Sequence, residues 1–113
     1  MTAKPTDRDS VLSFLKTYES TLATGRVERI VSLYANFNPA RRPELDEYFR
    51  QIVSDLVVRL DGIRIAVDGD HAEVGFDRTD SFTDRETGRP VQKGVSLNRH
   101  LERDGQTWRL VLR

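Results

Sequence analysis

The chain has 113 residues, of which 37% are hydrophobic, and this supplies enough apolar surface for one core but not for two. The 18 basic and 18 acidic side chains cancel, so no global field favours nucleic acid or an anionic membrane surface. The absence of cysteine excludes disulfides, thiolate metal sites and a cysteine nucleophile.

The sequence predicts a single domain over residues 1–113, with residues 1–6 flexible. The first residues contain no apolar stretch of signal-peptide length, and no apolar run reaches the roughly 18 residues of a membrane-spanning helix. We therefore expect a soluble, cytoplasmic protein with no membrane partner and no nucleic-acid partner.

Three amphipathic helices are predicted in residues 7–55. The first begins near Asp7 to Ser10, whose side chains can cap the first-turn amides, and it ends at Gly25. The second ends at Asn36 to Pro39, and the third begins after Pro43, a residue that suits the first turn of a helix. Their apolar stripes have spacings of three and four: Val11, Phe14, Leu15, Tyr18 and Leu22; Val27, Ile30, Val31 and Tyr34; and Leu45, Tyr48, Phe49, Ile52, Val53 and Leu56.

Residues 56–113 alternate apolar and polar side chains in four runs, separated by the turn signals Asp68-Gly69-Asp70, Glu86-Thr87-Gly88 and Asp104-Gly105. This pattern predicts a four-stranded antiparallel meander. The fold class is therefore α+β, with three N-terminal helices packed on the sheet.

The turns also predict which residues lie opposite each other. A turn at Gly69-Asp70 places Val67 opposite Ala72 and Ile65 opposite Val74, and a two-residue loop at Asp104-Gly105 places Leu101 opposite Trp108. The apolar parity of the first strand changes at Asp61-Gly62. One extra residue there, a β-bulge, restores the match and bends the sheet.

Three charged residues interrupt the face that is expected to meet the helices: Arg78, Asp80 and Arg99. An unpaired charge in such a place would cost several kcal/mol, so these side chains either pair with each other or reach water in a cavity. Two interpretations remain open. The cluster is either the floor or mouth of a ligand pocket, with Asp80 as base or anchor, or a structural ion pair at the rim of the sheet.

The two histidines do not point toward that pocket, because His71 stands beside a hairpin turn and His100 has outward parity. We expect both to face solvent or an interface. No HExxH motif, spaced histidine pair or inward carboxylate cluster occurs, so no metal site is predicted, and the absence of a glycine-rich loop between a strand and a helix gives no cofactor site. Tyr18, Tyr34 and Tyr48 lie on the helical stripes and could offer hydroxyls to a pocket, although we expect them to belong to the core.

The outward sheet face is polar but not uniformly charged, with residues such as Arg59, Glu73, Asp77 and Ser96. Such a surface can form a wet, symmetric interface, and for a chain this small we expect a homodimer.

The order of elements resembles the nuclear transport factor 2 (NTF2)-like superfamily, which includes SnoaL-like and ketosteroid-isomerase-like proteins. The resemblance rests on the second helix, Gly25-Arg26-Val27-Glu28-Arg29-Ile30-Val31-Ser32-Leu33-Tyr34, and on the final hairpin, Arg103-Asp104-Gly105-Gln106-Thr107-Trp108-Arg109-Leu110. It implies a cone with a cavity between sheet and helices. Only Ala35 to Arg42 connects the second and third helices, so the chain resembles a truncated member that lacks the usual hairpin there.

The resemblance implies a function as well as a fold. We expect a non-catalytic domain that binds a small hydrophobic ligand or a protein partner. The alternative is a SnoaL-like or epoxide-hydrolase-like enzyme that uses Asp80 with Arg78 and Arg99, since Arg78-Thr79-Asp80 is similar to the Arg-x-Asp element of limonene-epoxide-hydrolase-like enzymes. The residues expected to line the pocket are Phe14, Tyr18, Tyr34, Phe49, Phe76, Arg78, Asp80, Leu97, Arg99 and Trp108.

Overall fold

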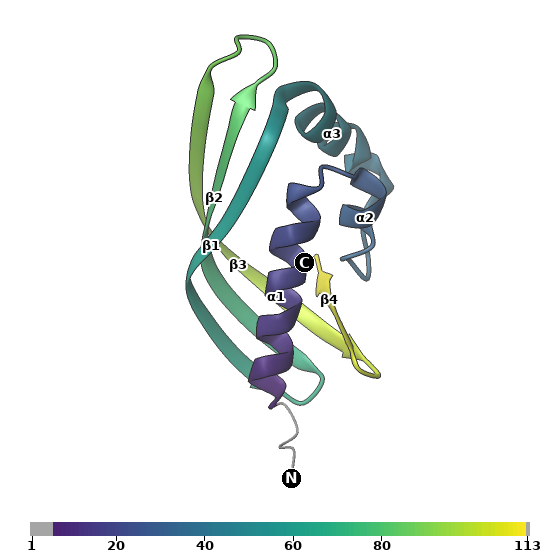
Figure 1. Ribbon diagram of the computed structural model, residues 1–113. Helices are drawn as coiled ribbons and strands as arrows, with labels where there is room; N and C mark the ends of the chain where they lie inside the picture. The colour runs from purple at the N-terminus through teal and green to yellow at the C-terminus, as the bar shows by residue number, and fades with distance from the viewer. Residues whose placement is uncertain (1–5, 113) are drawn as a thin grey trace.

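The computed structural model describes residues 6–112, so the flexibility expected for residues 1–6 lies, apart from Thr6, outside the described residues. Figure 1 shows helices standing along one side of a strongly bent antiparallel sheet. The sheet order β1-β2-β3-β4 confirms the predicted meander and the α+β class. The elements are α1 (Asp7–Ala23), α2 (Val27–Val31), η1 (Pro39–Arg41), α3 (Arg42–Asp46), η2 (Glu47–Ile52), β1 (Val53–Asp68), β2 (His71–Asp84), β3 (Pro90–Asp104) and β4 (Thr107–Val111).

The predicted start near Asp7 and the predicted end at Gly25 are confirmed, but the capping side chain is that of Thr6 and not one of Asp7 to Ser10. The Thr6 hydroxyl accepts a hydrogen bond from the Asp9 amide, and the Asp9 carboxylate accepts one from the Thr6 amide, so each residue satisfies an exposed first-turn donor. After the helix, Gly25 adopts a positive φ of 67° and donates its amide to Leu22. The helix is thereby bounded by local chemistry at both ends.

The second helix is shorter than predicted, because α2 ends at Val31 and Tyr34 is not helical. Tyr34 instead bridges Leu110 in parallel, with the Ala35 amide donating to Leu110 and the Leu110 amide donating to Leu33. The Asn36 side chain exchanges two hydrogen bonds with the backbone of Leu112. Hydrogen bonds to the open edge of β4 replace a further helical turn.

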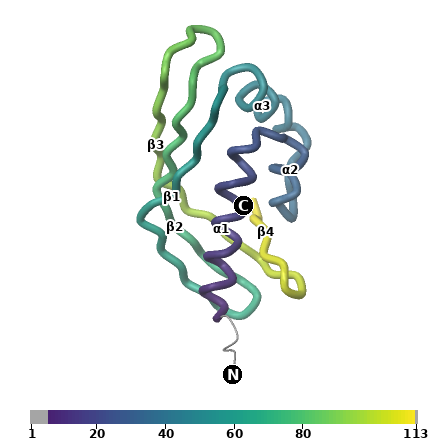
Figure 2. The backbone as a smooth tube through the Cα atoms, viewed as in Figure 1, coloured from purple at the N-terminus to yellow at the C-terminus, as the bar shows by residue number. Residues whose placement is uncertain are grey.

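No hairpin lies between α2 and α3 within residues 6–112, as the truncated pattern predicts. Figure 2 shows the chain passing from α2 through this short connection to α3, with β4 returning beside it. Within the same residues, no helix has both the length and the apolar character needed to cross a membrane.

The third helix also differs from the prediction. It continues from α3 into η2, a segment of π-helix, and ends at Ile52. Val53 and Leu56 therefore lie on β1, and the sheet begins before the expected Leu56. The reason is pairing across the sheet, since Val53 lies opposite Asp84 of β2.

The register between β1 and β2 confirms the predicted pairs Val67 with Ala72 and Ile65 with Val74. The predicted bulge is confirmed as well, because the register passes from Asp61 opposite Asp77 to Arg64 opposite Gly75, and Gly62 has a positive φ of 60°. A second irregularity, which the sequence did not predict, lies at Asp55, whose φ is 53°. Both add twist and bend to β1.

The predicted pairing of Leu101 with Trp108 is wrong. Leu101 lies opposite Leu110, and Trp108 lies opposite Arg103. The two turn residues are Gly105 and Gln106, and Gly105 at the first of them has a φ of 63°, as a type II′ turn requires. The observed register between β3 and β4 differs from the predicted one by two residues. Because side chains alternate between faces, a shift by an even number leaves every side chain on its expected face.

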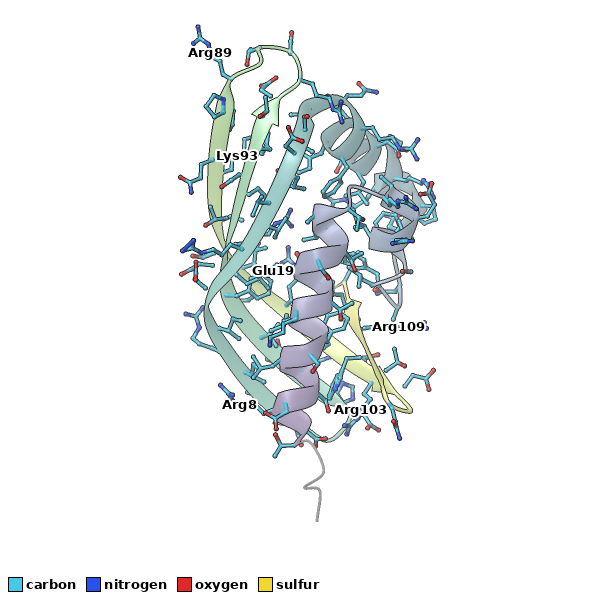
Figure 3. All side chains as sticks on the ribbon, viewed as in Figure 1. Arg8, Glu19, Arg89, Lys93, Arg103 and Arg109 are labelled. Carbon is cyan, nitrogen blue, oxygen red and sulfur yellow. The ribbon has the colours of Figure 1, made fainter. Side chains whose placement is uncertain are left out.

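The core lies between α1 and the inner face of the sheet. Its fully buried members come from both layers: Val11, Leu15, Val27, Ile30, Phe76, Leu101 and Leu110. Figure 3 labels Glu19 on the side of α1 that faces β1, where its carboxylate accepts a hydrogen bond of 3.0 Å from the Leu60 amide. β1 is an edge strand, so this bond satisfies a donor that has no partner strand.

The bulge glycine gives the first testable prediction. Gly62→Ala should lower the free energy of unfolding by about 1–2 kcal/mol, because a side chain disfavours positive φ and the new Cβ would also lie 3.3 Å from the Asp77 carboxylate. Gly94→Ala is the matched control, since Gly94 is also in the sheet but its new Cβ would meet nothing closer than 4.0 Å. Urea unfolding measures both, and equal effects would show that the bulge places no special demand on Gly62.

Candidate functional site

Arg78 and Asp80 form a bidentate ion pair on the inner face of β2. The Arg78 guanidinium donates from Nε to Asp80 Oδ1 and from an Nη to Oδ2, at 2.8 Å in both cases. The two side chains are only 17% and 7% exposed. A buried pair of this kind needs good geometry and further hydrogen bonds to offset the cost of removing two charges from water.

Two tyrosines from the helical layer supply those bonds. The Tyr48 hydroxyl donates to Asp80 Oδ2 at 2.6 Å, and the Arg78 guanidinium donates to the Tyr18 hydroxyl oxygen at 3.1 Å. Tyr48 lies in the π-helical segment η2 and Tyr18 lies on α1. We name Tyr18, Tyr48, Arg78 and Asp80 the inner polar cluster. It connects α1, η2 and β2.

The protonation states in this cluster follow from burial and hydrogen bonding. Burial raises the pKa of Tyr48, and its bond to the Asp80 carboxylate raises that pKa further, so the hydroxyl keeps its proton and acts as a donor. Burial alone would lower the pKa of Arg78. The hydrogen bond to Asp80 and the contacts with Tyr18 outweigh burial, so the pKa of Arg78 is raised and the guanidinium stays charged.

Asp80 is held by donors on both of its oxygens. The two oxygens accept three hydrogen bonds, two from Arg78 and one from Tyr48. A general base needs a carboxylate oxygen that a substrate proton can reach, and here both oxygens already accept from the charged Arg78 guanidinium. The arrangement is that of an anchored carboxylate, with three of about four acceptor sites in use.

A shallow depression of about 280 Å³ opens beside the inner polar cluster. Six residues line it: Tyr48, Arg78, Asp80, Lys93, Gly94 and Val95. Lys93 lies opposite Asp80 and Val95 lies opposite Arg78 in the β2–β3 register, so both belong to the inner face. We name this depression the β3 pocket, and its volume is at the lower end of those of small-molecule sites.

The β3 pocket combines a cation with apolar surface. The Lys93 ammonium lies 6.0 Å from the centre of the Tyr48 ring and 5.9 Å from that of Phe82. Val95 is 52% exposed, which is unusual for an inward-facing valine. Figure 3 labels Lys93 on the upper part of the sheet, above the level of Glu19 on α1.

Arg99 does not join the inner polar cluster. It lies opposite Val74, whereas Val95 is the residue opposite Arg78. Its guanidinium donates to the Asn98 carbonyl, and within residues 6–112 it makes no hydrogen bond or ion pair with Arg78 or Asp80. The proposed network of all three charges is therefore not formed. Parity placed Arg99 on the correct face but did not give its position along the strand.

The other residues expected to line a pocket are distributed over the molecule. Phe49 and Phe76 are packed in the core, and Tyr34 and Leu97 are half-buried against it. Phe14 and Trp108 line a separate open depression of about 610 Å³ between α1 and β4. Only Tyr18, Arg78 and Asp80 of the expected set meet in one cluster.

Sequence reasoning missed Tyr48 and Lys93 as members of the site. Tyr48 was assigned to the core as part of a helical apolar stripe, although its hydroxyl reaches Asp80. Lys93 carried a usable signal, because it alternates with Val91 and Val95 and so shares their face.

Comparison with known proteins shows the fold. No family model and no curated relative matches the chain. Among solved structures, a candidate dehydratase of the NTF2-like family from Streptomyces avermitilis superimposes with a TM-score of 0.79 at 16% identity, over 95% of this chain and 93% of that one. A candidate scytalone dehydratase from Novosphingobium aromaticivorans gives a TM-score of 0.78 at 12% identity, over 92% and 78% of the two chains.

A hexachlorocyclohexane dehydrochlorinase of LinA type 3 from Novosphingobium barchaimii gives a TM-score of 0.72 at 11% identity, over 91% of this chain and 80% of that one. The chain therefore has the NTF2-like fold, which confirms the resemblance at the level of structure. Identities this low carry no information about chemistry.

The inner polar cluster gives the second prediction. Asp80→Asn should lower the free energy of unfolding by about 3 kcal/mol, because it leaves the buried Arg78 charge without its counter-ion. The chain contains a matched control with the same spacing, since Arg59 and Asp61 also pair at 3.2 Å on neighbouring β1 but are 73% and 58% exposed. Asp61→Asn should change stability by less than about 1 kcal/mol. Chemical denaturation measures the two losses, and similar values would mean that Asp80 contributes no buried ion pair.

Proposed function

We propose that this domain binds a small organic anion with an apolar body and does not turn it over. The ligand would lie in the β3 pocket, with its charged group near Lys93 and its apolar part against Tyr48 and Val95. The observation that supports the proposal is that Arg78 and Tyr48 engage both oxygens of Asp80, the inward carboxylate that the enzyme alternative requires as a base.

Charge supports an anion as the ligand. The negative charge of Asp80 is neutralised by Arg78 in the same plane, so the net charge beside the pocket comes from Lys93. Among residues 6–112, Lys93 enters no ion pair within 4.0 Å. Its ammonium is therefore available to a carboxylate, a sulfonate or an enolate.

Exposed apolar surface supports the rest of the ligand. Val95, which is 52% exposed, and the half-buried ring of Tyr48 form an apolar wall close to the ammonium, with the buried Phe82 ring behind them. Covering such surface removes it from water and is favourable by about 25 cal/mol per Å². An inorganic anion could use only the ammonium, whereas an aromatic or aliphatic anion uses both features.

The enzyme alternative keeps one observation in its favour. The 2.6 Å bond between Tyr48 and Asp80 could place a phenol and a carboxylate at one reacting atom, if a substrate displaced Arg78 from Asp80. The similar structures include proteins named for dehydration and dehydrochlorination, which are eliminations. The alternative is therefore a lyase that acts in the same pocket.

The homodimer stays a separate proposal. It would use the polar outer face, which lies opposite the β3 pocket, so ligand binding and dimer formation do not compete. The cytoplasmic location expected from the sequence also stays a prediction.

The third prediction tests the ligand class with 8-anilinonaphthalene-1-sulfonate, an aromatic anion whose fluorescence rises in apolar surroundings. Lys93→Gln should weaken its binding between about two- and tenfold, because one partly exposed charge contact is lost. Lys16→Gln on the exposed face of α1 is the matched control and should leave binding unchanged. Equal affinities for the wild-type protein and Lys93→Gln would contradict the pocket, as would saturation at several dye molecules per chain.

The fourth prediction separates binding from catalysis. The wild-type protein should release no chloride from hexachlorocyclohexane and no water from scytalone, because both oxygens of Asp80 are held by Arg78 and Tyr48. Ion chromatography and absorbance follow the two reactions. Turnover that Asp80→Asn abolishes, with the fold shown to be intact by circular dichroism, would replace the binding proposal with the lyase alternative.

A further inference from the structure

The only two histidines of the chain meet on the outer face of the sheet, far from the inner polar cluster. His71 Nδ1 lies 3.2 Å from His100 Nε2, although the residues are 29 positions apart in sequence. Their positions in the sequence predict that both face solvent or an interface. His71 does, but the His100 side chain is only 6% exposed.

The strand register explains why four polar side chains gather there. His71 lies directly opposite Glu102, and Glu73 lies directly opposite His100. On each strand the two residues are two positions apart and so share the outer face. The result is a square of two imidazoles and two carboxylates on neighbouring strands.

We propose that this square is a binding site for a divalent transition-metal ion, with Zn²⁺ as the ion it suits best. The ligands would be His71 Nδ1, His100 Nε2 and a carboxylate oxygen of Glu102. Two imidazoles and one carboxylate, without thiolate, are a donor set that zinc accepts, and three protein ligands leave a coordination position for water.

The distances fit such an ion. The three ligand atoms form a triangle with sides of 3.2, 3.7 and 3.8 Å. The circle through them has a radius of about 2.1 Å, which is the length of zinc bonds to imidazole nitrogen and carboxylate oxygen. An ion in the plane of the triangle, or just above it, would therefore lie within bonding distance of all three ligand atoms after only small side-chain rotations.

Glu73 prepares His100 to be a ligand. His100 Nδ1 lies 2.7 Å from the Glu73 carboxylate, so Nδ1 carries the proton that it donates and Nε2 presents its lone pair toward the site. A carboxylate behind a ligating histidine is the usual second partner of a metal-bound imidazole. His71 would hold its proton on Nε2, which leaves the Nδ1 lone pair for the ion.

Arg103 fixes the turn that carries His71. Its guanidinium donates to the Asp70 carboxylate at 3.2 Å and to the Gly69 carbonyl at 3.0 Å, and its amide donates to the Asp70 carbonyl. Arg103 follows Glu102 on β3, so the contact holds the His71 turn against the strand that bears the other two ligands. The ligands are positioned before an ion arrives.

The site is also accessible. His71 and Glu102 are 59% and 46% exposed, and an open depression of about 320 Å³ borders His71, Glu73 and His100. Without an ion, the same residues would form only a hydrogen-bonded network that stabilises the outer face. The experiment must distinguish these two cases.

Isothermal titration calorimetry, with Zn²⁺ alone added to tag-free, chelator-treated protein, tests the proposal. We expect one ion per chain, a loss of affinity of at least about 100-fold in His71→Ala, and a loss of about 10- to 100-fold in Glu73→Gln. We choose His71→Ala because the His71 side chain is exposed and its removal should not affect folding. Removing the buried His100 side chain could unfold the protein. Glu47→Gln, an exposed glutamate on η2, is the matched control and should bind normally.

Nitrogen NMR of the imidazoles supplies a second measurement that needs no activity. Zn²⁺ should shift His71 Nδ1 and His100 Nε2 together at one equivalent. Three results would overturn the site: no binding, binding that His71→Ala leaves intact, or one ion for every two chains. The first result would mean that the square is only a hydrogen-bonded network. The other two would mean that the ion binds at another site or between two chains.

Discussion

The buried ion pair between Arg78 and Asp80 is the interaction on which the layering of this domain depends. Two charges removed from water are tolerated only when every donor and acceptor is satisfied, and that requirement draws in Tyr18 from α1 and Tyr48 from η2. The helical layer is therefore tied to the sheet by directional bonds in addition to apolar contact. The same bonds hold both oxygens of Asp80, so the interaction that stabilises the fold is also the one on which the proposed function rests.

The strands β2 and β3 carry two polar clusters of opposite character, one on each face. On the inner face Arg78 and Asp80 are paired and enclosed, with Lys93 beside them. On the outer face, His71 Nδ1 and His100 Nε2 lie 3.2 Å apart, with Glu102 beside them. The alternation of side chains along a strand keeps the two clusters apart by the thickness of one sheet. The ligand site and the metal site that we propose therefore lie on opposite faces of one hairpin.

The short connection between α2 and α3 shows how tertiary structure overrides a local pattern. Val27, Ile30, Val31 and Tyr34 have helical spacing, yet the helix ends at Val31 because Leu33 and Ala35 bond to the exposed edge of β4. Asn36 completes the contact through Leu112. An unpaired strand edge offers several hydrogen bonds at once, which outweigh one further turn of a short helix. In this truncated form of the fold, a few residues cover an edge that would otherwise be open.

The sequence by itself determined the layers, the strand faces, the start of the first helix near Asp7, its end at Gly25 and the bulge at Gly62. Each of these follows from local rules, namely side-chain alternation, capping and the freedom of glycine at positive φ. The sequence also predicted the pairs beside the Gly69 turn, but only the tertiary structure decided which residues meet across β3. Arg99 has the parity of Arg78 but lies elsewhere along β3, whereas His71 and His100 are distant in sequence and adjacent in space. The physical reason is that one strand sets the face of a residue, while contact needs the register between two strands, which the turns and bulges set together.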